Sequence, residues 1–307
     1  MILTVCMSPC VDVTIELDSL NVGKTNVVKG KSLSLGGKAL NVAVGIARLG
    51  GDVHTTGIMY EDNGYMFEKA LKAENVGFSF VWNKGRVREN YKFIDNRSML
   101  TEVNDVSAPI TREKMEEVLA LIKSLSAKSA VTVISGGLPR GAEDGFYAEM
   151  VRAVHPSSLR VVDATGKRLF SAIEQGVDLV KPNLEELENA MGRRITDKAE
   201  LLSACYELID RGAKRVLLSL GRKGAVITDG SRNYYCKSIN VAVNSTVGAG
   251  DSMVAATSVL LEKGAGLKEL LLAGIAGGTA SVMNSHEHTF EKETYEDVLS
   301  KLEFKEI

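Results

Sequence analysis

The sequence has few cysteines, no long apolar run and almost no net charge. Its 307 residues include only 4 Cys, and none of them forms a Cys-x-x-Cys pair. Cys6 and Cys10 are separated by three residues, which is a poor match to zinc-ligand spacing. The four histidines also lack a metal-ligand pattern. We therefore expect all four cysteines to be reduced and structural, and the histidines to lie on the surface.

No apolar stretch reaches the roughly 18 residues that a membrane-spanning helix needs. The first residues, Met1–Val5, have neither a basic leader nor a small-residue cleavage site, so a first β-strand is expected there. These features predict a cytoplasmic protein with no membrane partner. With 37 basic and 39 acidic residues, the net charge of −2 argues against a general nucleic-acid binder.

Two common nucleotide-binding motifs are absent as well. No Gly-x-x-x-x-Gly-Lys-Ser/Thr is present, which disfavours a P-loop kinase, and no Gly-x-Gly-x-x-Gly is present, which disfavours a Rossmann dehydrogenase. The composition, 45% hydrophobic and 25% charged, is that of a soluble globular chain. We expect one domain over residues 1–307, with no internal repeat or linker.

From Thr111 onward, helical patterns alternate with short, continuously apolar strands such as Ala130–Ile134. This alternation predicts an α/β fold whose mostly parallel central sheet is covered by helices on both faces. Two β-rich segments, about 12–33 and 86–107, interrupt the pattern. We expect them to form one small sheet over the main domain, together with Phe78–Trp82.

The sequence Val247-Gly-Ala-Gly-Asp-Ser252 precedes an apolar segment. Two glycines around an alanine allow a tight turn that exposes backbone N–H groups. If a helix starts at Asp251, these groups form an anion hole suited to phosphate. A carboxylate there would repel phosphate, which makes sense if Asp251 takes a proton from an attacking hydroxyl. The alternative is an aspartate N-cap after a glycine turn.

Three further groups carry polar chemistry, and each has a structural alternative. The first is Gly36-Gly37-Lys38-Ala39-Leu40-Asn41, whose flexible backbone, cation and amide could bind a polar ligand. Its structural alternative is an ordinary loop before an Asn-capped helix. Arg88, Asn90 and Lys92 alternate along a strand and could bind a phosphate monoester, or form a solvated face. Asn183 and Glu186 could order water around Mg²⁺, or favour a helix start.

Polar residues also follow four consecutive predicted strands. In open α/β sheets, ligands bind beyond the carboxyl ends of strands, so these segments are expected to share one rim. Loop chemistry alone uses the same residue types. The segments are Ser135–Pro139, Asp163–Gly166, Lys181–Asn183 and Ser219–Gly221.

In this order, these motifs resemble the ribokinase-like (PfkB) carbohydrate kinases over essentially the whole chain. Gly36–Ala43 is similar to the first family signature, and Asn244–Ser252 to the second, which is highly specific. Lys181–Leu187 resembles the family's Asn-x-x-Glu element. Arg88–Lys92 and Thr101–Asn104 are most similar to 1-phosphofructokinases and tagatose-6-phosphate kinases.

The resemblance implies a three-layer αβα kinase with a β-sheet lid that can mediate a homodimer. It implies a catalytic base at Asp251 and an anion hole at Gly248, Ala249 and Gly250. Substrate contacts are implied for Asp12, Gly36, Gly37, Lys38, Asn41, Arg88, Asn90, Lys92 and Ser135. ATP contacts are implied for Lys181, Asn183, Ser219, Gly221, Gly224, Val247 and Asn284, with Mg²⁺ held through water by Asn183 and Glu186.

The chain departs from the family pattern at several positions. Ala39 replaces a glycine of the first signature, and residues 285–289 lack the usual Gly-Thr-containing loop. Ser8, Ser245 and Ala256 are further departures from the wider family or this branch.

We therefore expect an ATP-dependent sugar-phosphate kinase, with fructose 1-phosphate as the preferred substrate. Tagatose 6-phosphate is the nearest alternative, followed by an unphosphorylated sugar or a nucleoside. A non-catalytic sugar-phosphate sensor is the least favoured alternative, because a protein that only binds its ligand gains nothing from the carboxylate of Asp251 beside a phosphate.

Overall fold

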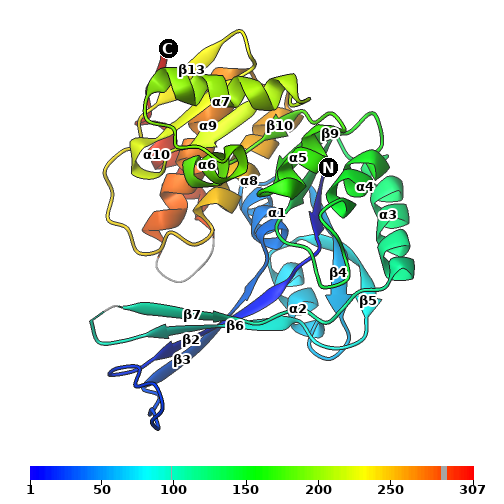
Figure 1. The fold of residues 1–307 in the computed structure, drawn as a ribbon, viewed down its shortest axis with the longest axis vertical. Coiled ribbons are helices and arrows are strands. Elements are labelled where there is room, and N and C mark those ends of the chain that lie inside the picture. Colours follow the sequence, from blue (N-terminus) through cyan, green and yellow to red (C-terminus); the bar gives the residue numbers. More distant parts are fainter. Residues whose placement is uncertain (98, 285–288) are drawn as a thin grey trace.

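The computed structural model of the chain describes residues 1–97, 99–284 and 289–307 (Figure 1). Within them, ten strands form the main sheet. In sheet order these are β14 (Phe304–Glu306), β13 (Asn233–Cys236), β12 (Ala225–Thr228), β11 (Val216–Ser219), β10 (Leu179–Val180), β9 (Leu159–Asp163), β8 (Val131–Ser135), β1 (Ile2–Cys6), β4 (Val53–Tyr60) and β5 (Gly77–Asn83). Neighbours from β11 to β5 pair in parallel, and β12, β13 and β14 extend the sheet as antiparallel strands.

Helices cover this sheet on both faces (Figure 1). Helix α1 packs on α8, α8 on α9 and α9 on α10, whereas α3 packs on α4 and α4 on α5. The helices are α1 (Lys38–Arg48), α2 (Tyr65–Ala73), α3 (Arg112–Ser126), α4 (Phe146–Ala153), α5 (Lys167–Ile173), α6 (Leu184–Met191), α7 (Lys198–Asp210), α8 (Ala249–Glu262), α9 (Leu267–Met283) and α10 (Lys292–Leu299), with a 3₁₀ turn η1 (Gly221–Lys223). None of the helices in the described residues is long and apolar enough to cross a membrane.

The predicted three-layer α/β fold is confirmed, and its core follows from the sequence. The strands at the centre are mostly apolar because helices cover both of their faces. All five residues of β1 and all five of β8 are buried. The parallel arrangement brings the carboxyl ends of β8, β9, β10 and β11 side by side, which places the four polar segments along one edge.

A separate four-stranded sheet projects from the body (Figure 1). Its order is β3 (Gly30–Gly36), β2 (Cys10–Glu16), β6 (Arg88–Ile94) and β7 (Leu100–Asn104). The central pair, β2 and β6, is parallel and joins segments about 80 residues apart, with Asp12 opposite Asn90. We call this the small sheet.

Several expected boundaries were wrong. Phe78–Trp82 does not belong to the small sheet, because β5 pairs in parallel with β4 at the edge of the main sheet. The helix after the glycine turn begins at Ala249 rather than Asp251. The short strand β14 was not anticipated. All four cysteines are free and buried, and burial raises the pKa of Cys6 and Cys10 to about 12.

Candidate active site

The glycine turn places Asp251 in the first turn of α8. Gly248 caps the helix with φ +81°, a left-handed conformation that favours glycine. Asp251 is consequently the third helical residue, not the cap, and only 6% of it is exposed. The first N–H groups of a helix lack intrahelical acceptors and lie at the positive end of its dipole. This end of α8 therefore combines an anion-binding backbone with a buried carboxylate.

The surroundings of Asp251 make it a better proton acceptor than an exposed aspartate. Burial, and next the nearby charge of Asp163, raise the pKa of Asp251 from 3.8 to about 6, although Lys38 and Asn41 act in the opposite direction. Asn41 on α1 donates from Nδ2 to Asp251 Oδ2 at 2.8 Å and orients the carboxylate. At neutral pH the group is still mainly ionised, so it can accept a proton.

Asp163, at the end of β9, lies between two lysines. Its Oδ2 is 3.3 Å from Lys38 Nζ, and its Oδ1 is 3.4 Å from Lys181 Nζ. Burial alone would raise the pKa of Asp163, but Lys181 and Lys38 hold it below its ordinary value. Asp163 therefore stays charged and fixes both ammonium groups. The sequence placed it at the rim but gave it no role of its own, because its partners lie far away along the chain.

The small sheet presents an aspartate and three nitrogen-bearing side chains on one face. Asn90 Nδ2 donates to Asp12 Oδ1 at 3.0 Å, and Lys92 Nζ lies 3.1 Å from Asp12 Oδ2. Arg88 Nη1 donates to Asn90 Oδ1 at 2.9 Å. Arg88 Nε is buried and has no hydrogen-bond partner among the described residues. A buried, unsatisfied donor is costly, so this guanidinium is suited to accept an anionic ligand.

Asn183 and Glu186 form a capping box at the start of α6. Asn183 Oδ1 accepts from Glu186 N at 2.8 Å, and Glu186 Oε2 accepts from Asn183 N at 2.9 Å. The helix-start alternative is thus realised. Glu186 Oε1 lies 3.8 Å from Lys38 Nζ and faces the site. Within the described residues, no cluster of three or more His, Cys, Asp or Glu side chains could hold a metal ion.

One cavity of about 470 Å³ collects most of the predicted substrate residues; we call it the sugar cavity, after the ligand that the sequence predicts for these residues. Asp251, on α8 of the body, and Arg88, on β6 of the small sheet, both line it. Ser135 is the exception, because its hydroxyl donates to Asp163 Oδ2 at 3.1 Å beneath the surface. The predicted residues in the lining are Asp12, Gly36, Gly37, Lys38, Asn41, Arg88, Asn90, Lys92, Lys181, Asn183, Glu186, Ser219, Val247, Gly248, Gly250 and Asp251.

The sugar cavity also contains residues to which the sequence gave no role. Glu102 and Asn104 reach it from β7, opposite Lys92 and Asn90 in the strand register. Their alternation along the strand was the available signal, as it was for β6. Ser8 lines the cavity too, so this departure from the family pattern lies at the site.

A second cavity of about 400 Å³ adjoins the first, and we call it the nucleotide cavity after the ligand that the sequence predicts for Ser219, Gly221 and Gly224. Asn183, Ser219 and Gly250 line both, and Ala249, Gly221 and Gly224 line the second. Most of its remaining wall comes from the loop after β13 and from α9. The sequence gave these lining residues no role, although it predicted a nucleotide contact at Asn284, just after α9. Asn284 itself is not in the lining; its Nδ2 donates to Thr289 O at 3.1 Å. The loop that differs from the family pattern spans residues 285–289, and residues 285–288 of it lie outside the described residues.

Comparison with known proteins gives one consistent result. The family model described as pfkB family carbohydrate kinase matches residues 5–291. Tagatose-6-phosphate kinase of Staphylococcus epidermidis strain RP62A is 29% identical, with 100% of each chain covered. The 1-phosphofructokinase of Haemophilus influenzae is 26% identical, covering 98% of this chain and 97% of that protein. The crystal structure of Escherichia coli phosphofructokinase-2 with fructose-6-phosphate is 25% identical, has a TM-score of 0.87 and covers 97% of this chain and 98% of that one.

Proposed function

Because this chain belongs to the pfkB family of carbohydrate kinases, we propose that it phosphorylates fructose 1-phosphate with ATP to give fructose 1,6-bisphosphate. Its membership makes it a phosphotransferase with an alcohol group as acceptor, and its relatives make it a sugar-phosphate kinase. The choice among sugar phosphates is our inference. The cations of the small sheet, Arg88 and Lys92, support a sugar that already carries a phosphate, because they would be superfluous for an unphosphorylated sugar.

The observation that carries this proposal is the position of Asp251 at the junction of two adjoining cavities. Gly250, its neighbour, lines both of them. A hydroxyl in the sugar cavity and a γ-phosphate in the nucleotide cavity would meet at the first turn of α8. Phosphoryl transfer requires this in-line arrangement of acceptor, phosphorus and leaving oxygen.

Each residue then has a defined task. Asp251 accepts the proton of the attacking hydroxyl, and Asn41 keeps its carboxylate oriented. The backbone of Gly248–Gly250 stabilises the charge on the phosphoryl oxygens. Lys38, fixed by Asp163, offsets negative charge on the transferred group. Arg88 and Lys92 hold the phosphate already present on the sugar.

Mg²⁺ is the expected cofactor, and the residues fit a hydrated ion. Mg²⁺ usually keeps several waters and uses one or two carboxylates together with substrate phosphates. Glu186 Oε1 faces the site, while Glu186 Oε2 and Asn183 Oδ1 are engaged in the capping box. When bound, the ion would neutralise charge on the ATP phosphates.

Tagatose 6-phosphate is the second candidate substrate. It is supported by the relative of that name, which matches over its whole length. The two candidates share a six-carbon chain with its phosphate at one end and the reacting hydroxyl at the other. Both would place the phosphate under the small sheet and the hydroxyl at Asp251.

We also propose that the small sheet acts as a lid and that two copies pair through it. One domain, residues 1–307, would carry the lid as its two insertions. Leu33, Leu100 and Val103 on the lid strands are each 54% exposed, which is costly for large apolar residues unless another surface covers them. Sedimentation of the purified chain would test the dimer.

The substrate is tested by coupled measurement of ADP release over fructose 1-phosphate, tagatose 6-phosphate, fructose 6-phosphate and fructose. We expect the highest kcat/KM with fructose 1-phosphate and the lowest with fructose. A higher value with tagatose 6-phosphate would establish the second candidate. A higher value with fructose than with every phosphorylated sugar would refute the role given to Arg88 and Lys92.

A further inference from the structure

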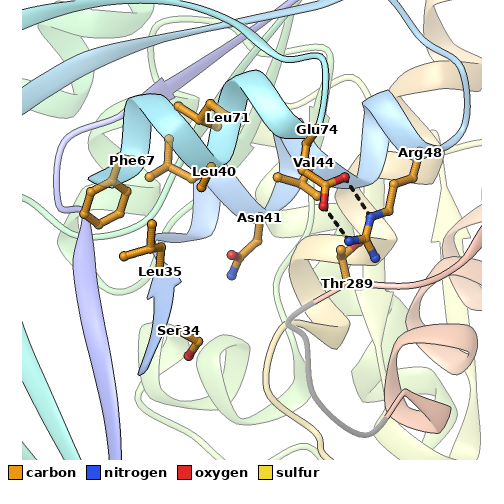
Figure 2. Close-up of a pocket in the computed structure, with 11 residues that line it drawn as sticks. Ser34, Leu35, Leu40, Asn41, Val44, Arg48, Phe67, Leu71, Glu74 and Thr289 are labelled. Atoms are coloured by element: carbon orange, nitrogen blue, oxygen red, sulfur yellow. Dashed lines mark hydrogen bonds and ion pairs between the residues drawn. The ribbon is translucent and has the colours of Figure 1, made fainter. Parts of the chain in front are cut away.

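A third cavity, of about 210 Å³, shares Asn41 with the sugar cavity and lies between β3, α1 and α2 (Figure 2). We call it the α1–α2 cavity. Figure 2 shows side chains of the three elements facing one common space. Its apolar wall contains Leu35, Leu40, Val44, Phe67, Ala70 and Leu71.

The polar groups at one end of this cavity disfavour a charged ligand. Arg48 Nε donates to Glu74 Oε2 at 3.0 Å, Arg48 Nη2 to Glu74 Oε1 at 2.6 Å, and Arg48 Nη1 to Glu291 Oε1 at 3.0 Å. Two carboxylates thus already bind this cation. A third carboxylate would be repelled by them, and an added cation would compete with Arg48 for them.

Thr289 supplies a hydroxyl that has no partner within the part of the chain that the structure describes. It lines the cavity near Arg48 (Figure 2) and is only 4% exposed. Its Oγ1 is buried and makes no hydrogen bond to any described residue. A buried hydroxyl without a partner is costly, and a ligand with one hydroxyl would satisfy it.

Asn41 connects this cavity to the chemistry. It lines both the α1–α2 cavity and the sugar cavity, and its amide donates to Asp251. A molecule that displaced the Asn41 side chain would remove the hydrogen bond that orients the carboxylate. Asp251 lines the sugar cavity, whereas a molecule in the α1–α2 cavity would lie on the other side of the Asn41 amide.

We infer that the α1–α2 cavity binds a small neutral molecule with an apolar body and one hydroxyl, and that its occupancy lowers turnover through Asn41. The size fits a single ring, since an engineered apolar cavity of about 150 Å³ binds benzene. The effect on turnover rests on the proposed kinase function, whereas the binding does not.

The experiment uses benzyl alcohol as the probe and reads binding by saturation-transfer NMR, independently of activity. Ala70→Leu fills the cavity from α2 and replaces no residue that is assigned to the reaction. Ala73→Leu makes the same change on an exposed site of the same helix and is the matched control. Thermal unfolding of each variant checks that it folds.

We expect saturable binding to the wild type and Ala73→Leu, and binding at least about tenfold weaker to Ala70→Leu, because the added carbons occupy the space. Benzyl alcohol should lower kcat more than it changes KM in the first two proteins and leave kcat of Ala70→Leu unchanged. Absence of saturable binding to the wild type, or equal binding to Ala70→Leu, would overturn the site. Saturable binding with unchanged kcat would overturn the coupling through Asn41. If no sugar phosphate is turned over at all, the kinase proposal fails, while the NMR result still decides the site.

Discussion

Replacing Asp251 by asparagine should abolish most turnover and at the same time stabilise the protein. Asparagine has nearly the same shape and keeps an oxygen that can accept the hydrogen bond of Asn41, but it cannot take a proton at neutral pH. A general base typically contributes 10²- to 10⁴-fold, so we expect kcat to fall about a thousandfold, or about 4 kcal/mol in activation free energy. KM for the sugar phosphate should change only a few-fold.

The expected gain in stability follows from the pKa of Asp251. Burial raises this pKa from 3.8 to about 6, so the folded state holds the proton more tightly than the unfolded state. Stability from this group is therefore fully present below pH 3.8 and is lost as the pH rises through 6. At pH 7.5 the ionised carboxylate costs about 3 kcal/mol of unfolding free energy, at 1.36 kcal/mol per pKa unit. The neutral amide of the Asp251→Asn variant would not bear this cost, and Tm should rise by roughly 5 °C.

The assay compares wild type, Asp251→Asn and Asp62→Asn, an exposed control, by ADP release and by thermal unfolding at pH 5 and pH 7.5. The stability difference between wild type and Asp251→Asn should be larger at pH 7.5 than at pH 5. Turnover of Asp251→Asn within tenfold of the wild type would refute the role of the base. A lower Tm than the wild type at pH 7.5 would refute the cost of its burial.

Four other outcomes are expected. In the wild type, kcat/KM should rise with pH through about 6, and Asn41→Leu should move this limb to higher pH, because the amide lowers the pKa of Asp251. Arg88→Gln should raise KM for the sugar phosphate roughly 10- to 100-fold and leave KM for ATP unchanged, since a charge-assisted contact is lost. Asp163→Asn should lower Tm by roughly 10 °C in thermal unfolding, because Lys181 is left buried without a carboxylate. Gly248→Ala should lower stability by about 1–2 kcal/mol in chemical denaturation, because its φ is +81°.

Local patterns predicted the body of the fold because each strand carries its own signal. The buried runs of β1 and β8 and the amphipathic helices between strands are visible in short windows of sequence. Phe78–Trp82 shows the limit of prediction from local patterns. Its aromatic pattern is that of any half-buried strand, and only its pairing with β4 assigns it to the main sheet. Pairing between distant segments has no local signature.

The same distinction between local and distant signals applies to the candidate site. Asp251 was identified because a glycine turn, an acid and an apolar segment are consecutive. Asp163 was given no role because Lys38 is 125 residues away from it in the sequence. Asn183 and Glu186 show a different limit, since the same spacing serves a capping box and a hydrated metal ion. Spacing identified the pair but did not distinguish the two uses.

Asp163 and Asp251 show how one site gives two carboxylates different roles. Both are buried, and burial alone would raise both pKa values. Asp163 has Lys38 and Lys181 within 3.4 Å, so it remains an ion and serves as their anchor. Asp251 has an amide at 2.8 Å and the charge of Asp163 nearby, so its affinity for a proton increases. Pairs of acids with pKa values driven apart are typical of proton-transfer sites. Asp163 thus raises the proton affinity of Asp251, and the proposed role of Asp251 as the base depends on the position of both carboxylates.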